Sequence, residues 1–142
     1  MGNLASKLLA RAREGRRMTL LIRPCGGVMA RLNSIVAVVC AADVGAARVL
    51  AKTRPPYLAV EPPELIGGDR AVSTARPEVV SGTVSAVRAV SPGTLVLCGA
   101  GVHDRRDVAR ALELGAEGVL VASAVTRAPD TERAIRELLA GY

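Results

Sequence analysis

One carboxylate in this chain stands where α/β proteins keep reactive side chains. Glu61 ends the apolar run Tyr57–Glu61, which we predict to be a short buried strand. Pro62-Pro63 then stop the strand, because proline has no N–H for a ladder and fixes its own φ. Reactive groups of such proteins lie at the carboxyl ends of parallel strands and in the loops that follow. Glu61 is therefore a candidate for proton-transfer chemistry, and a solvated glutamate in an ordinary turn is the alternative interpretation.

Three loops that follow predicted strands are built to approach a ligand closely. The long loop Pro62–Arg76 has the length of a lid, and Ile66-Gly67-Gly68 at its middle offers accessible backbone N–H groups. Gly99-Ala100-Gly101 would let the backbone reach an anion, although a lone Gly-X-Gly is more often a tight turn. Ala122-Ser123 precedes a helical turn whose N–H groups would point outward. If the fold is a barrel, these loops together predict a phosphate site.

The elements that must position these residues alternate between strands and helices. Short runs rich in valine and leucine predict parallel strands that are buried on both faces, at Ser34–Ala41, Tyr57–Glu61, Thr94–Cys98 and Gly118–Val121. Helical periodicity, with Asp43, Asp104 and Asp130 as N-caps, Pro77 in a first turn and Gly115 as a helix end, predicts helices over 43–52, 77–90, 106–114 and 130–140. Near the start, 4–13 is expected to be helix and 18–22 a further strand. The pattern matches half of an eight-stranded (β/α) barrel or a small doubly wound sheet.

Composition excludes several classes of function. The formal charge of +6 is carried almost wholly by arginine, which favours anionic partners, but the arginines are dispersed and Phe and Trp are absent, so a nucleic-acid interface is not expected. Three cysteines without a CxxC and a single histidine, His103, indicate neither a metal site nor a disulfide framework. No stretch approaches the roughly 20 apolar residues of a membrane span. We expect no cofactor and no metal, and a cytoplasmic location.

The motifs AVEPPELIGG, AVSTARPEVVSGTV, LVLCGAGV and ALELGAEGVLVAS resemble the carboxyl-terminal half of an archaeal-type triosephosphate isomerase. The resemblance covers roughly residues 37 to 139 and implies a partial (β/α)8 TIM barrel, with about the last four to five strand–helix units. It divides the chain into an irregular amino-terminal segment, 1–33, and a half-barrel, 34–142, that carries the catalytic base and the phosphate loops.

The resemblance also implies an activity in glycolysis and gluconeogenesis, the interconversion of dihydroxyacetone phosphate and glyceraldehyde 3-phosphate. Glu61 falls on the catalytic base, and the loop after it on the lid that shields the substrate from water. Triosephosphate isomerases are themselves the standard worked example of such a base paired with a neutral imidazole under a closing lid. The phosphate-binding positions implied are Ile66, Gly67, Gly101, Ala122 and Ser123. Full-length relatives of the archaeal type tend to be tetramers, which implies a homo-oligomer.

The chain departs from the family pattern at two chemical groups. The family's electrophilic histidine should follow the strand 18–22, where Arg23-Pro24-Cys25-Gly26 stand instead, and His103 lies after a later strand. The family's amino-terminal lysine has no counterpart, because the first three strand–helix units are missing; Lys7 and Lys52 are expected on helix surfaces. We therefore expect impaired isomerase activity. The alternative is a non-catalytic half-barrel that binds phosphate or serves as an assembly fragment.

Overall fold

The computed structural model describes residues 37–142. The helix predicted over 4–13, the strand predicted over 18–22, the segment boundary at 33 and the first residues of the strand predicted over 34–41 lie outside this range. Within it the elements are β1 (Val38–Ala41), α2 (Val44–Ala51), β2 (Tyr57–Val60), the 3-10 helix η1 (Pro63–Leu65), α3 (Val72–Ala75), α4 (Pro77–Val90), β3 (Leu95–Cys98), α5 (Arg105–Glu113), β4 (Gly118–Val119), α6 (Ser123–Thr126) and α7 (Thr131–Leu139).

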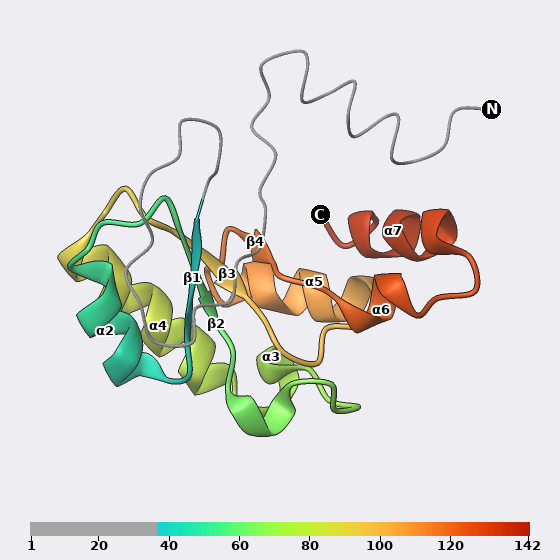
Figure 1. Ribbon diagram of the computed structural model, residues 1–142, viewed down its shortest axis with the longest axis horizontal. Helices are drawn as coiled ribbons and strands as arrows, with labels where there is room; N and C mark the ends of the chain where they lie inside the picture. The colour runs from blue at the N-terminus through green and yellow to red at the C-terminus, as the bar shows by residue number, and fades with distance from the viewer. Residues whose placement is uncertain (1–36) are drawn as a thin grey trace, which may run out of the picture.

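The strands form one parallel four-stranded sheet in the order β1-β2-β3-β4 (Figure 1). A doubly wound sheet needs a point where the strand order reverses, and the described strands have none. Sequential parallel strands joined through helices are the arrangement of a (β/α) barrel wall. The α/β fold and its partial-barrel architecture are therefore confirmed, and the doubly wound alternative is wrong for this part of the chain.

One face of the sheet carries the helices. Leu58 and Val96 pack with Ala47 of α2 and with Val84 and Val87 of α4 in one buried cluster. Helices α2 and α4 lie side by side there, and α5, α6 and α7 form a second group beyond β4 (Figure 1). A second cluster joins residues farther along the same strands to α3, α4 and α5: Val60, Val72, Val80, Cys98 and Ala111. The packing of these helices on the sheet fixes the positions of the strand ends.

The opposite face of the sheet is less completely covered. Leu97 is half-buried and Leu95 is 42% exposed, whereas Val96 between them is fully buried. The expectation that the strands are buried on both faces is thus wrong for β3, although Leu58, Ala59 and Val60 of β2 have no exposed surface. Side chains alternate across a strand, so these two leucines point to the face that a closed barrel would turn inward.

The predicted helix signals are confirmed at all described positions. Asp43, Asp104 and Asp130 each accept a hydrogen bond from a backbone amide of the first turn, as N-caps do. Pro77 is the first residue of α4, and proline costs no hydrogen bond there, because an N–H at that position has no partner inside the helix. Gly115 follows α5 with φ +91°, a left-handed conformation that favours glycine. Local chemistry therefore determines where these helices begin and end.

The segment 62–76 is more ordered than the loop predicted for it. Pro63–Leu65 form η1 and Val72–Ala75 form α3, so only residues 66–71 connect them. The two ends are also joined, because the Glu64 carboxylate accepts a hydrogen bond from the Arg76 guanidinium. A hydrogen bond from its own backbone N–H lowers the pKa of Glu64, and the contact with Arg76 lowers it further.

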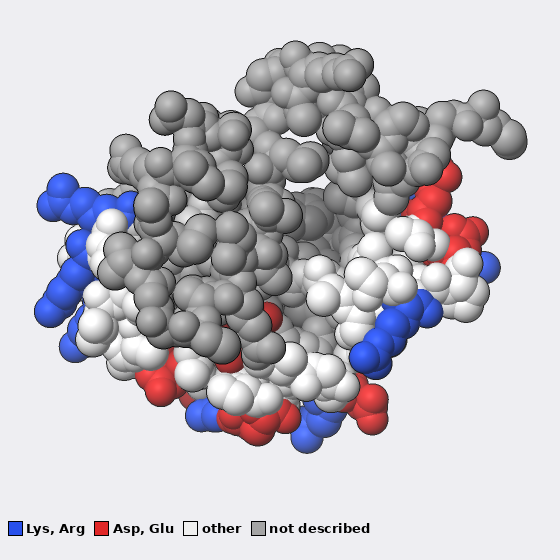
Figure 2. All heavy atoms as spheres, in the orientation of Figure 1, with Lys and Arg blue, Asp and Glu red and all other residues white. Residues whose placement is uncertain are grey.

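The surface of the described residues mixes charges of both signs. On the face drawn in Figure 2, basic and acidic side chains alternate along the lower and right edges, and several basic side chains lie together at the left edge. Ion pairs such as Arg88–Glu117, Arg110–Glu113 and Arg136–Glu132 account for part of this pattern. Among residues 37–142, no helix combines the length and apolar character required to cross a bilayer.

Candidate functional site

A cleft of about 200 Å³ opens at the carboxyl edge of the sheet. It is formed by the segment after β2, the turn after β3, and the residues from the end of β4 through α6. Its lining contains all six residues predicted for the site: Glu61, Ile66, Gly67, Gly101, Ala122 and Ser123. The structure thus brings together residues from three separate loops, as the shared strand edge requires.

Glu61 stands at the rim because the strand ladder continues one residue beyond β2. Its amide donates to the Ala41 carbonyl at 2.8 Å, and in the same row Gly99 donates to Val60 at 3.0 Å and Leu120 to Cys98 at 2.9 Å. These bonds fix the backbone of Glu61 while its half-buried side chain lines the cleft. A carboxylate on a rigid strand end, open to a cavity on one side, is suited to accept a proton from a bound molecule.

Gly99 determines where the Glu61 side chain can lie. A Cβ at position 99 would stand 2.9 Å from Oε1 and 3.0 Å from Cδ of Glu61, and nearer still to Cγ. Ordinary contacts between carbon atoms begin near 3.5 Å. The glutamate chain therefore rests directly on the bare backbone of the next strand, and only glycine leaves room for it.

The middle of the segment after Glu61 supplies backbone rather than side chains to the cleft. The Ile66 amide donates to Pro63 at 3.3 Å, whereas the Gly67 amide donates to no acceptor in the described chain. Gly67 has φ +73°, and nothing lies within 4 Å of the position its Cβ would take. Of the two positions predicted here, Gly67 therefore has the available amide.

The turn after β3 is held in an unusual conformation beneath the end of that segment. Ala100 and Gly101 have φ +67° and +68°, and such a conformation is strained at a non-glycine residue. The Ala100 carbonyl accepts the Val72 amide at 3.2 Å, which anchors the start of α3. A Cβ on Gly101 would overlap the Arg70 carbonyl, so glycine there lets the returning backbone lie on the turn. The Gly101 amide has no acceptor within residues 37–142.

The third wall of the cleft is the start of α6. Ala122 precedes the helix and Ser123 is its first residue, and neither amide has an acceptor in the part of the chain described. Sequence reasoning missed one further residue of this wall, Arg127, which caps α6 and also lines the cleft. The signal that could have found it is spacing, since Arg127 follows Ser123 by one helical turn.

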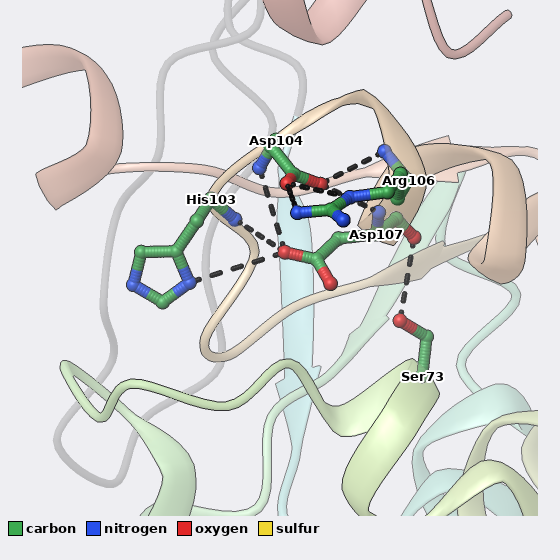
Figure 3. A network of polar contacts seen from close by, with 5 residues as sticks. All are labelled: Ser73, His103, Asp104, Arg106 and Asp107. Atoms are coloured by element: carbon green, nitrogen blue, oxygen red, sulfur yellow. Dashed lines mark hydrogen bonds and ion pairs between the residues drawn. The ribbon is translucent and has the colours of Figure 1, made fainter.

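A polar network fixes the loop between Gly101 and α5 (Figure 3). Asp107 lies at its centre, and its carboxylate accepts hydrogen bonds from the backbone amides of His103 at 2.9 Å and Asp104 at 3.4 Å. Its carbonyl accepts the hydroxyl of Ser73, a fully buried residue of α3, at 3.3 Å. Asp104 in turn pairs with Arg106, and that hydrogen bond holds the pKa of Asp104 below its usual range. The network ties α3 to α5 beside the cleft.

The remaining candidates for chemistry lie outside the cleft. His103 is an exposed residue before α5, as predicted, and does not line the cavity. Lys52 is exposed at the carboxyl end of α2. Cys98 is a buried strand-end residue, also as predicted, and burial raises the pKa of its thiol to about 12. Within residues 37–142, no group of three or more His, Cys, Asp or Glu side chains is arranged to hold a metal ion.

Comparison with known proteins identifies the family of this chain. The family model described as triosephosphate isomerase matches residues 29–138. The triosephosphate isomerase of Methanocaldococcus jannaschii is 52% identical over 102 residues, 72% of this chain and 47% of the relative. That of Methanothermus fervidus is 49% identical over 107 residues, 75% of this chain and 48% of the relative. That of Methanosarcina acetivorans is 43% identical over 124 residues, which cover 87% of this chain and 56% of the relative.

Among solved structures, one chain in the crystal structure of the Amycolatopsis orientalis BexX/CysO complex matches with a TM-score of 0.46 and 24% identity, covering 75% of this chain and 43% of that one. The chain spans about half the length of the curated relatives it matches. Because the family model covers most of the sequence, the chain belongs to the triosephosphate isomerase family.

Proposed function

We propose that this chain carries the proton-transfer base and the phosphate cradle of a triose-phosphate isomerase. The observation that supports this most directly is the single cleft that Glu61 shares with the amides of Gly67, Gly101 and Ser123, which have no acceptor within residues 37–142. Backbone amides without internal partners bind phosphate oxygens well, because each donates a hydrogen bond to a charged acceptor. A carboxylate facing such a cradle would act on the carbon end of a small phosphorylated substrate.

In the proposed reaction, the Glu61 carboxylate takes a proton from the carbon next to the carbonyl of dihydroxyacetone phosphate. The electrons of the broken C–H bond form the carbon–carbon double bond of an enediolate while the C=O π electrons move onto the carbonyl oxygen. The hydroxyl proton of the first carbon passes to that oxygen, with solvent as the carrier, and the proton held by Glu61 returns to the former carbonyl carbon to give glyceraldehyde 3-phosphate. The segment 62–71 would act as the lid, since η1 and α3 anchor its two ends and Gly67 lies at its open middle. Exclusion of water under a lid strengthens a carboxylate as a base.

The electrophile that would polarise the carbonyl has no candidate among the described residues of this cleft. The sequence contains one histidine, His103, and it does not line the cavity. Loss of one general acid or base lowers a rate by about 10²–10⁴-fold. We therefore propose that the 142-residue polypeptide alone turns over slowly, with proton exchange depending on Glu61.

The experiment is proton exchange measured by NMR, as deuterium incorporated into dihydroxyacetone phosphate in D₂O, beside a coupled isomerase assay. Glu61→Gln should abolish the exchange, because an amide does not accept the proton. Glu113→Gln is the matched control, since Glu113 is an exposed glutamate on α5 outside the cleft. If the wild-type chain turns over at a near-normal rate and Glu61→Gln abolishes that turnover, the missing electrophile is not needed. Phosphate binding with no exchange above buffer would favour a non-catalytic half-barrel.

The remaining proposals follow from family membership. The substrate would be a triose phosphate, residues 34–142 would act as the half-barrel unit, and the protein would work in the cytoplasm in glycolysis and gluconeogenesis. A homo-oligomer, with the tetramer as the form to test first, is proposed on the same basis. Sedimentation velocity of the purified chain measures the oligomeric state directly.

A further inference from the structure

The cleft contains two charged side chains of opposite sign on opposite walls. Of its described lining residues, only Glu61 and Arg127 are charged; the others are apolar residues, glycines and Ser123. Glu61 belongs to the segment after β2, and Arg127 to the end of α6 after β4. Since the substrate proposed above is an anion, Arg127 is the single described cation that the cleft can offer it.

The separation of the two walls follows from the sheet. Glu61, Gly99 and Leu120 continue the ladders of three adjacent strands in one row, with β3 between β2 and β4. Neighbouring strands lie about 4.8 Å apart, so the β2 and β4 ends are roughly 10 Å apart across the row. A small phosphorylated molecule can therefore extend from the carboxylate on one wall toward α6 on the other.

Arg127 is also available to act on a ligand. Arg76, Arg88, Arg105, Arg106, Arg110 and Arg136 each lie within ion-pair distance of a carboxylate. Arg127 is exposed and pairs with no carboxylate of residues 37–142. Its backbone amide donates to Ser123 at 3.1 Å, which fixes its Cα one turn beyond that cleft residue. No described acidic group thus competes with an incoming anion for its guanidinium.

We infer that Arg127 is a substrate-binding residue that recognises the phosphate end of the ligand and so directs the carbon end toward Glu61. The inference rests on the proposed function, because it assumes that this cleft binds a phosphorylated triose. A planar guanidinium donates two parallel hydrogen bonds to phosphate oxygens, which orients the group as well as attracting it. The available amides of Gly101 and Ser123 would complete the coordination of the same phosphate.

The test is a calorimetric titration with glycerol 3-phosphate, a three-carbon phosphate without the reactive carbonyl, and with glycerol as the uncharged control. Arg127→Gln removes the charge and keeps a polar side chain, and Arg127→Lys keeps the charge without the planar fork. Arg133→Gln is the matched control, because Arg133 is an exposed arginine of α7 outside the cleft. Thermal unfolding should be unchanged in all three variants, since the substituted side chains are exposed.

We expect Arg127→Gln to weaken glycerol 3-phosphate binding about tenfold, the lower range for a hydrogen bond to a charged group, with a smaller loss for Arg127→Lys. Arg133→Gln should change it less than twofold. If the wild-type chain binds glycerol 3-phosphate and Arg127→Gln changes the dissociation constant less than twofold, the inference is overturned and the proposed function stands. Absence of glycerol 3-phosphate binding by the wild-type chain would overturn both.

Discussion

Substitution of Gly99 by alanine tests the position of the proposed base without requiring catalysis. The new Cβ would lie 3.0 Å from Cδ and 2.9 Å from Oε1 of Glu61, and closer to Cγ. Carbon atoms in ordinary contact are about 3.5–4.0 Å apart, so the glutamate chain, whose Cγ lies nearest, must move by about 1 Å. Forcing an extra methyl group into a packed site costs about 1–3 kcal/mol. We expect Gly99→Ala to lower the free energy of unfolding by that amount.

The cause of this destabilisation can be isolated by a second substitution. All three of the nearest atoms belong to the Glu61 side chain beyond its Cβ, and Glu61→Ala removes them. In the Glu61→Ala background, Gly99→Ala should therefore cost little, or stabilise by about 0.4–1 kcal/mol through the unfolded chain. The two substitutions should show a coupling energy of about 1–3 kcal/mol, as residues in direct contact do.

The assay is equilibrium urea unfolding of the four proteins of this double-mutant cycle. Gly93→Ala in both backgrounds is the control, because nothing lies within 4 Å of the Cβ position at residue 93. Equal costs of Gly99→Ala with and without the glutamate side chain would refute the placement of Glu61 over Gly99. If the placement is right, proton exchange should also fall by about 10²-fold in Gly99→Ala, since a displacement near 1 Å is sufficient for such a loss.

Two further predictions concern the scaffold around the cleft. Burial raises the pKa of Cys98 to about 12, so the native state keeps a proton that the unfolded chain releases above about pH 9. The free energy of unfolding should therefore fall between pH 9 and 12 by at most about 1.4 kcal/mol per pH unit, and urea unfolding of Cys98→Ala should lack this contribution. The Asp104 carboxylate accepts hydrogen bonds from the amides of Arg106 and Asp107 at the start of α5. In thermal unfolding, Asp104→Ala should therefore lower the free energy of unfolding by about 1 kcal/mol, whereas Asp104→Asn should retain most of the cap. Equal losses in the two variants would contradict a capping role.

The parts of the fold that sequence predicts best are those determined by neighbouring residues. Asp43, Asp104 and Asp130 begin helices because a short acceptor side chain satisfies amides that have no partner inside the helix. The four strands are recognisable because a sheet covered by helices requires continuous valine- and leucine-rich runs. Those strands also predict that Glu61 and Ser123 share a cleft, since parallel strands end at one edge.

What the sequence does not reveal depends on contacts between distant residues. Helix α3 falls in a segment predicted as loop, yet its start is anchored by the Ala100 carbonyl and its Ser73 hydroxyl donates to Asp107. Neither partner is near α3 in sequence, so no local pattern announces the helix. Arg127 has a local signal, its spacing of one helical turn from Ser123, but the fold is needed to show that it lines the cleft.

The turn after β3 makes two parts of the proposed site depend on one another. Gly99 leaves the space that the Glu61 side chain occupies, and two residues later Gly101 leaves the space for the backbone of Arg70 and Ala71. The Ala100 carbonyl between them anchors α3 at Val72. A shift of this turn would therefore move the carboxylate and the returning end of the 62–71 segment together. These contacts also explain how Ala100 is held in a left-handed conformation next to Gly101, because such strain at a non-glycine residue persists only where surrounding contacts fix it.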